Sequence, residues 1–221
     1  LRLFQKKLSH ADMMLVVSQK DTHYLQEHFP DKKVIHLPSF HPNEQLNIEP
    51  GQSDFALYHG NLAVAENYHA AEYLIENVFS QTDVPLVVAG LNPPEKLKRL
   101  AAQYANVSIE ENPDDTRMFQ LIREAQVHVL VTFQATGLKL KLLNTLYNGR
   151  HILVNPAMVS GTLAGDICEQ GRDAGELITK LKTLMQKPFD ETAIKERKKL
   201  LEKYYSNETN VKRLMDLVWE E

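Results

Sequence analysis

Cysteine is nearly absent from this sequence, since Cys168 is the only one among 221 residues. A single thiol excludes an internal disulfide and a zinc site built from several cysteines. The histidines and acidic residues also lack the spacing of a metal site, so we expect no metal ion. Low cysteine usage is typical of a reducing compartment, and we expect the protein to be cytoplasmic.

Long apolar runs and blocks of one charge are also missing. No run approaches the roughly 20 residues that span a bilayer, and the first residues lack the order of a secretory signal. The chain has 25 Lys and Arg against 29 Asp and Glu, a formal net charge of −4, and it contains no basic cluster that would favour nucleic acid. With 221 residues, 43% of them hydrophobic and 24% charged, we expect a soluble globular protein with one large core and a fragment of another.

The sequence does contain a regular alternation of apolar and amphipathic segments from Phe55 onward. The apolar segments predict strands over residues 55–59, 85–89, 107–110, 127–132 and 151–154. The intervening segments predict helices over 67–79, 94–104, 116–125 and from Gly137 to Gly149, and later helices begin near Ala174, Glu191 and Glu208. This alternation is typical of a parallel sheet covered by helices on both faces. We therefore predict a Rossmann-like α/β domain over 51–188 and carboxyl-terminal helices over 189–221.

The first 50 residues form a separate region. Their pattern predicts a strand over 13–18, a helix over 19–29 capped by Ser18, and a short strand over 34–37. The proline, asparagine and glycine content of 38–51 indicates a linker. We expect residues 1–50 to be the tail of an amino-terminal α/β domain, followed by an interdomain crossing.

The stretch from Phe133 to Val154 carries the first indication of function. A predicted buried strand ends at Thr132, a loop opens at Gly137 into an amphipathic helix, and Gly149 ends that helix. A helix that begins at the carboxyl end of a parallel strand directs free N–H groups into the crevice where such sheets bind ligands. These donors favour an anion, so the stretch predicts a phosphate-bearing ligand.

A series of short motifs follows in a characteristic order: Tyr58 to Leu62, Glu66-Asn67, Val88 to Pro93, Asn112-Pro113, and Thr136 through Asn144 to Gly149. In this order they resemble the carboxyl-terminal domain of GT-B fold glycosyltransferases of the retaining family-four type. The resemblance covers nearly the whole chain. It implies a domain that holds a nucleotide-sugar donor as substrate and requires no cofactor.

The resemblance also implies roles for individual residues. The glycine at position 60 would let the backbone approach the donor phosphates, while Thr136 and Gly137 would bind the diphosphate through a hydroxyl and helix-terminal amides. Asn144, about two helical turns after Gly137, would reach a ribose. The full set of implied donor-binding residues is Gly60, Asn61, Gly90, Asn112, Gln134, Thr136, Gly137, Lys139, Lys141 and Asn144. Ordinary turns, a ligand-free helix start and solvated lysines are the competing interpretations.

Departures from the family pattern are concentrated in the same region. The family signature places two glutamates where this chain has Thr136 and Asn144, and an arginine and a lysine where it has Asn61 and Glu66. One interpretation is a divergent branch in which Lys139, Lys141 or Arg150 supplies the positive charge. The other is an interaction module whose nucleotide site has decayed. No catalytic residue is assigned from the sequence.

The function implied by the resemblance is transfer of a hexosyl group from a nucleotide-sugar to a glycan or lipid-linked acceptor in polysaccharide biosynthesis. The expected partners are the donor, the acceptor, the remainder of the amino-terminal domain and, peripherally, a membrane surface. Because acceptors bind mainly to that amino-terminal domain, we expect this region to be inactive alone. Epimerisation of a sugar nucleotide is a weaker alternative that would use Glu110, Glu111 and Asp115. A basic cluster at Lys195, Arg197, Lys198, Lys199 and Lys203 is more typical of a solvated helix face.

Overall fold

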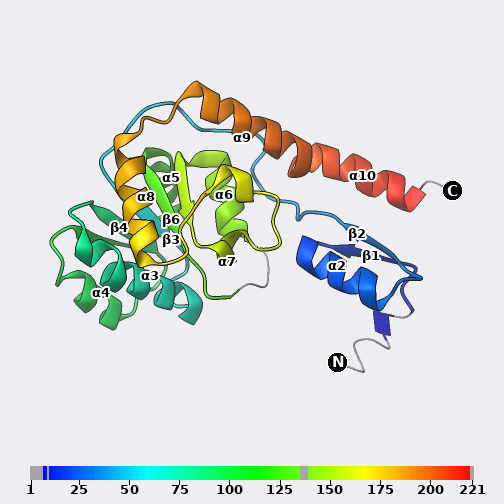
Figure 1. The fold of residues 1–221 in the computed structure, drawn as a ribbon, viewed down its shortest axis with the longest axis horizontal. Coiled ribbons are helices and arrows are strands. Elements are labelled where there is room, and N and C mark those ends of the chain that lie inside the picture. The colour runs from blue at the N-terminus through cyan, green and yellow to red at the C-terminus, as the bar shows by residue number, and fades with distance from the viewer. Residues whose placement is uncertain (1–6, 9, 135–138, 220–221) are drawn as a thin grey trace.

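The main unit of the computed structural model is a six-stranded sheet in which every neighbouring pair is parallel (Figure 1). The model describes residues 7–8, 10–134 and 139–219. The strand order is β5-β4-β3-β6-β7-β8. The strands are β3 (Ala56–His59), β4 (Leu86–Gly90), β5 (Val107–Glu111), β6 (Val127–Leu130), β7 (His151–Val154) and β8 (Glu169–Gln170). This is the order of a doubly wound Rossmann sheet, so the predicted fold class is confirmed.

Helices cover both faces of this sheet (Figure 1). The helices α3 (Ala65–Asn77), α4 (Glu95–Ala101) and α8 (Ala174–Gln186) lie on one side, and α5 (Asp115–Glu124) and α6 (Leu140–Asn148) lie on the other. Strand β3 is buried at all four positions, because alternate side chains enter the two helical layers. Leu57 packs with Leu121 and Ile122 of α5, whereas Tyr58 packs on the α3 side.

The predicted elements are present with small shifts at their ends. The helix expected over 94–104 is shorter, and the strand expected to reach Thr132 ends at Leu130. Between Pro156 and Gly171, where the pattern is blurred, the chain forms α7 (Pro156–Val159), a 3-10 turn (Gly165–Ile167) and the edge strand β8. A second 3-10 turn (Phe79–Gln81) follows α3.

A smaller unit precedes the main sheet. Its strands β1 (Met13–Val16) and β2 (Lys33–His36) pair in parallel, and α2 (Gln19–His28) connects them with Ser18 as its N-cap. The Ser18 hydroxyl accepts a hydrogen bond from the Asp21 N–H at 3.4 Å, which confirms the predicted cap. This unit touches the main domain where the Gln19 N–H donates to the Gly161 carbonyl at 3.1 Å.

The carboxyl-terminal helices cross back toward this smaller unit. Helix α9 (Glu191–Tyr204) leaves the main domain, and α10 (Asn207–Trp219) continues beside β2 (Figure 1). Arg213 of α10 lines a cavity together with residues of α2 and β2, so α10 faces the smaller unit across this cavity. Trp219 is 68% exposed. Among the described residues, no helix is long and apolar enough to cross a bilayer.

Arg197 does not belong to the basic surface of α9 that the sequence indicated. It is 3% exposed, and its guanidinium donates to the carbonyls of Gly149 and Arg150. It also packs over the Phe189 ring, with 4.8 Å between the guanidinium carbon and the ring centroid. Arg197 therefore fastens α9 to the turn before β7, and the predicted patch loses one of its charges.

Gly90 marks the closest approach of two backbone segments at the carboxyl edge of the sheet. A Cβ atom at position 90 would lie 1.8 Å from the Gly60 carbonyl oxygen. No rotamer change can relieve this contact, because both groups belong to the backbone. The absence of a side chain at Gly90 is therefore required by the fold itself.

We predict that Gly90→Ala destabilises the protein by more than about 3 kcal/mol, since the overlap must displace the β3–α3 loop. Chemical denaturation monitored by circular dichroism measures this loss. Gly165→Ala is the matched control, because a Cβ there meets only the Gln170 amide at 3.7 Å. Equal stability of the two variants would contradict the backbone explanation.

Candidate functional site

The candidate site lies where the order of the main sheet reverses, between β3 and β6. From the carboxyl end of β3 the chain runs through residues 60–64 into α3, and from β6 it runs through residues 131–139 into α6. The two connections lead to helices on opposite faces of the sheet, and doubly wound sheets bind ligands in the crevice at such a reversal point, so this place is called the crevice below. Residues 135–138, which include Thr136 and Gly137, lie outside the described residues.

Asn67 is the centre of a hydrogen-bond network at this crevice. Its side-chain oxygen accepts from the Lys141 ammonium, and its side-chain nitrogen donates to the Asn61 carbonyl at 2.9 Å. Its backbone carbonyl accepts from the Tyr58 hydroxyl at 3.1 Å. One residue in the first turn of α3 thus connects β3, the β3–α3 loop and α6. Tyr58 and Asn67 are structural members of the site that composition alone does not identify.

Lys141 brings a positive charge to the loop at Gly60. Its ammonium donates to the Tyr58 hydroxyl at 3.3 Å and lies 5.1 Å from the centroid of that ring. A Cβ atom at Gly60 would lie only 3.3 Å from the same ammonium nitrogen. The lack of a side chain at Gly60 therefore leaves room for the Asn67 side chain and the Lys141 ammonium beside the loop, while the Gly60 N–H itself donates to the Ala89 carbonyl at 3.1 Å.

Burial changes the titration of the groups around this cation. It lowers the pKa of Lys141 to about 8, with the field of Glu66 acting in the opposite direction and that of Lys139 adding to the decrease. Burial, reinforced by Glu66, also raises the pKa of the Tyr58 hydroxyl well above its usual value. Lys141 is thus a partly desolvated cation at neutral pH, and an anion that enters the crevice gains more from it than from a solvated lysine.

Glu66 is placed at the same crevice, on the first turn of α3. Its carboxylate accepts a hydrogen bond from the hydroxyl of Thr132, a buried residue just beyond β6. Thr132 is itself fixed by Asn155, whose side chain bonds both the N–H and the carbonyl of Thr132 at 3.1 and 2.7 Å. The acidic side chain does not point away from the site, and its charge acts on Lys139 and Lys141.

The remaining predicted residues are distributed around the edge of the crevice. Lys139 donates to the Gln134 carbonyl at 2.8 Å, and both belong to the β6–α6 connection. On the far side of Gly90, the Asn112 side chain accepts from the Asn92 N–H at 2.7 Å. Asn61 uses its side-chain oxygen for the Ala63 N–H at 3.1 Å.

Two predicted positions point elsewhere. The side-chain oxygen of Asn144 accepts from Asn148 at 3.0 Å, and Asn148 also reaches Asn43 of the linker at 2.9 Å. Arg150 precedes β7 and donates to the carbonyls of Glu124 and Ala125, at the opposite edge of the sheet. The idea that Arg150 supplies charge to the crevice is therefore wrong, whereas Lys139 and Lys141 are both present there.

Two of the acidic residues considered for epimerisation are engaged in ion pairs at the outer strand of the sheet. Glu110 on β5 pairs with Arg117, with 3.1 Å between the nearest charged atoms, and Glu111 pairs with Lys98 at 2.8 Å. Strand β5 is the outer strand of the sheet, two strands away from the reversal point next to β3. Among the described residues, no group of three or more histidine, cysteine or acidic side chains is arranged to hold a metal ion.

Two buried histidines lie between the sheet and the helices α5 and α6. His59 lies 3.0 Å from the Thr145 hydroxyl, which itself donates to the Lys141 carbonyl at 2.8 Å, so the imidazole N–H donates to the hydroxyl oxygen. Burial lowers the pKa of His59 to about 3, and the nearby Lys141 charge adds to the effect. His128 stacks edge-on against His59, and burial lowers its pKa as well. Both are neutral structural residues.

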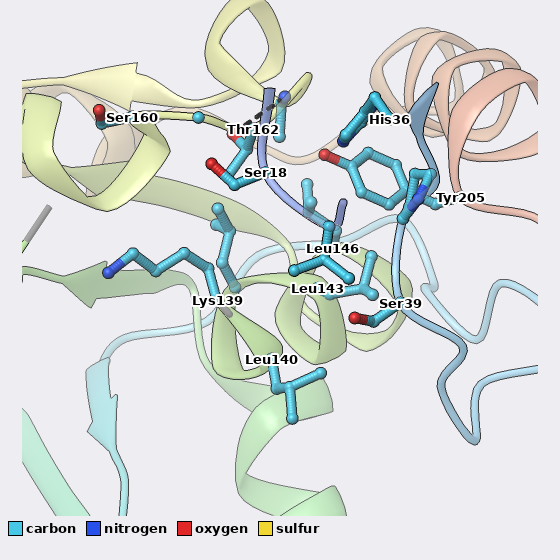
Figure 2. A pocket seen from close by; sticks show the side chains of 15 residues that line it. Ser18, His36, Ser39, Lys139, Leu140, Leu143, Leu146, Ser160, Thr162 and Tyr205 are labelled. Atoms are coloured by element: carbon cyan, nitrogen blue, oxygen red, sulfur yellow. Dashed lines mark hydrogen bonds between the residues drawn. The ribbon is translucent and has the colours of Figure 1, made fainter. Parts of the chain in front are cut away.

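A small cavity lies between the smaller unit and α6. It has a volume of about 50 Å³. Figure 2 shows Leu143 and Leu146 of α6 on one side, the hydroxyls of Ser18 and Thr162 on another, and the Lys139 chain along its edge. Its lining is therefore an apolar floor with a hydroxyl-bearing rim.

We predict that the free energy of unfolding falls as the pH decreases below about 6.5, because the unfolded chain protonates His59 and the native state does not until about pH 3. The contribution of neutral His59 to the free energy of unfolding is complete above pH 6.5. Between pH 6.5 and about 3 it changes by up to about 1.4 kcal/mol per pH unit. Urea denaturation between pH 7 and 5 measures the slope. His59→Gln should reduce it, while the exposed His23→Gln should not. Identical slopes in all three proteins would exclude this assignment.

The described fold is similar to several solved structures. The structure of S. aureus TarM G117R in complex with fondaparinux, alpha-GlcNAc-glycerol and UDP is 11% identical, with 98% of this chain and 45% of that chain covered and a TM-score of 0.72. The GtfA/B complex is 11% identical, with 99% and 48% covered and a TM-score of 0.69. The OtsA apo structure is 10% identical, with 98% and 62% covered and a TM-score of 0.68.

These similarities bear on the fold. No protein-family model matches the chain, and no curated protein matches its sequence. The chain spans about half the length of the first two structural neighbours. Its structural neighbours are GT-B glycosyltransferases, and its six-stranded unit has the Rossmann-like architecture of GT-B domains.

Proposed function

We propose that this chain is the donor-binding region of a glycosyltransferase and that it holds a nucleotide-sugar in the crevice between residues 60–64 and 131–139. The observation that carries this proposal is the Lys141 ammonium, which is held by Asn67 and Tyr58 against the backbone of Gly60 at the reversal point of the sheet. A partly buried cation at this point of the sheet is suited to a phosphate. The structural neighbours support the same assignment, since the TarM structure with a similar fold is a complex that includes UDP.

In this proposal Lys141 and the amino-terminal turn of α6 act together on the donor phosphate. As the bond between the sugar and the phosphate oxygen breaks, negative charge grows on the leaving group. A preorganised ammonium and helix amides stabilise that charge more strongly in the transition state than in the ground state. Thr136 and Gly137 are proposed to contribute the hydroxyl and amide contacts, and Gln134 and Lys139 the edge of the phosphate site.

The other predicted residues have secondary roles in the proposal. Asn112 and the backbone of Gly90 would lie near the nucleoside, because they border the crevice on its β4 side. Asn144 would reach the ribose only after releasing its bond with Asn148. The carboxylates of the family signature have no counterpart here, and we assign no catalytic base.

The acceptor is proposed to be a glycan or lipid-linked sugar that enters beside α6. The small cavity between α6 and the smaller unit borders Lys139, with hydroxyls over an apolar floor, and marks the side of α6 on which the acceptor is proposed to enter. The two-stranded β1–β2 sheet is proposed to belong to a larger amino-terminal domain that completes the acceptor site. A cytoplasmic enzyme of polysaccharide biosynthesis with peripheral membrane contact is consistent with this assignment.

A second candidate function is a non-catalytic module of the same fold. It is favoured by a specific observation, the carboxylate of Glu66 at the phosphate site together with the absent glutamates at positions 136 and 144. In that case the crevice binds no nucleotide.

We predict that this chain binds a nucleoside phosphate and that Lys141→Met weakens the binding about tenfold or more, because a charge-assisted contact contributes about 1.5–3 kcal/mol. Calorimetry with the mono- and diphosphates of uridine, guanosine, cytidine and adenosine measures the affinity. Lys180→Met is the matched control, because Lys180 pairs with Glu169 on α8 and β8. A folded chain that binds none of these ligands would favour the non-catalytic module.

A further inference from the structure

A cavity separates the carboxyl-terminal helix α10 from the smaller unit. It has a volume of about 310 Å³ and lies between α2, β2 and α10, the helix that runs beside β2 (Figure 1). Besides two aliphatic side chains of β2, the described residues that line it, none of which belongs to the crevice, are Gln19, Thr22, His23, Gln26, His36 and Arg213. Three of them are basic and none is acidic. A basic lining without acidic counter-ions favours an anionic ligand.

The three basic side chains come from three different elements. His23 stands on α2, His36 ends β2, and Arg213 lies on α10. Burial lowers the pKa of His36, and the fields of Arg213 and His23 add to the decrease, while a hydrogen bond with the Val17 backbone opposes it. The charged and titratable groups that face His36 from α2 and α10 are therefore basic, as His36 itself is.

Arg213 has no carboxylate partner among the described residues. Its neighbour Lys212 pairs with Glu208 on the same helix at 2.7 Å, and Lys198 of α9 pairs with Glu202, whereas Arg213 takes part in no ion pair or side-chain hydrogen bond of the described part of the chain. A guanidinium carries five N–H donors in a planar fork that matches phosphate oxygens. At Arg213 these donors are available to a ligand in the cavity.

Hydrogen bonds fix α2 against β2 below these basic groups. The hydroxyl of Thr22, a residue that is only 5% exposed, donates to the Ser18 carbonyl at 2.8 Å. The Gln26 amide donates to the carbonyl of the buried Val34 on β2 at 3.1 Å. These bonds hold the two elements that carry His23 and His36 in a fixed relation, so both imidazoles border the cavity from the smaller unit while Arg213 borders it from α10.

We propose that this cavity binds a phosphate group, as inorganic phosphate or as a phosphate monoester, through Arg213, His23 and His36. The oxygens of the group accept hydrogen bonds from the guanidinium and from both imidazoles, and charge-assisted bonds of this kind are strong ones in proteins. The volume is about ten times the roughly 30 Å³ that a water molecule occupies in the liquid, so a phosphate fits. The bound group links α10 to the smaller unit.

The test is calorimetry of this chain with inorganic phosphate and with phenyl phosphate at pH 7. All proteins carry Lys141→Met, which removes the cation of the proposed donor site, so that binding at the crevice does not contribute. In this background we expect one ligand to bind per chain. Adding Arg213→Met should weaken the binding about tenfold or more, because it removes a charge-assisted contact.

Lys212→Met is the matched control in the same background. Lys212 is the preceding residue of α10, it pairs with Glu208, and it is not among the described residues that line the cavity. This substitution removes the same charge from the same helix and should leave the affinity unchanged. The comparison separates a local contact from a general effect of positive charge.

Sulfate tests the two histidines, because its charge stays the same between pH 8 and pH 6. In the Lys141→Met background we expect sulfate to bind at least about threefold tighter at pH 6 than at pH 8, since a bound anion favours the protonated imidazoles. Replacing both histidines, His23→Gln with His36→Gln, should remove this dependence. Thermal unfolding checks that each variant is folded, and if Arg213→Met is not, the pH dependence of sulfate binding decides.

Two outcomes support the proposal and identify the ligand further. Tighter binding of phenyl phosphate indicates a phosphate monoester, and tighter binding of inorganic phosphate indicates the free ion. The proposal is wrong if neither ligand binds, if Arg213→Met and Lys212→Met bind equally well, or if sulfate binding does not change with pH. None of these results depends on nucleotide binding at the crevice, so this proposal and the proposed function can fail separately.

Discussion

The contact between Lys141 and Asn67 is the interaction on which the organisation of the crevice depends. It joins the first turns of two helices that lie on opposite faces of the sheet, and it does so at the carboxyl edge where β3 and β6 are neighbours. A buried ammonium without partners would be costly, so Asn67 and Tyr58 must keep their orientations for α6 to begin where it does. The positive charge at Gly60 is therefore a consequence of how the two helical layers meet.

Under the proposed function, this arrangement would supply a positive charge at the site without the cationic residues of the family pattern. The chain has Asn61 and Glu66 where the family pattern has an arginine and a lysine, and Lys141 approaches the same loop from α6 instead. The positive charge thus comes from α6, which lies on the other face of the sheet from α3. Glu66 lies at the same place on α3, where its carboxylate accepts a hydrogen bond from the Thr132 hydroxyl.

The sheet and most helix positions were predictable, because buried parallel strands and amphipathic helices have different hydrophobic periods. The capping role of Ser18 was predictable from its position before the helix that begins at Gln19. The two-residue strand β8 was not, since such a short edge strand leaves no periodic signal. At the site, the resemblance predicted Gly60, Lys139 and Lys141, and the structure has Gly60 on the β3–α3 loop, Lys139 just before α6 and Lys141 in its first turn.

The sequence pattern could not predict the side-chain hydrogen-bond network at the site. Asn67 and Thr132 are joined to partners 74 and 66 residues away, and no local rule selects such pairs. The same limit applies to Gly90, where the reason for a glycine is the Gly60 carbonyl across the β3–β4 pair. Arg150 and Arg197 illustrate the opposite error, because the pattern predicted a ligand contact for one and an exposed helix face for the other. Arg150 instead bonds backbone carbonyls at the end of α5, and Arg197 bonds those of the turn before β7.

The most direct test of this account is a crystal structure of the chain with the nucleotide that binds it best. The account predicts a phosphate oxygen within hydrogen-bonding distance of the Lys141 ammonium, beside the β3–α3 loop, with Asn67 still holding the lysine. A nucleotide bound elsewhere, with the Lys141 contacts to Asn67 and Tyr58 unchanged and no phosphate beside them, would contradict it.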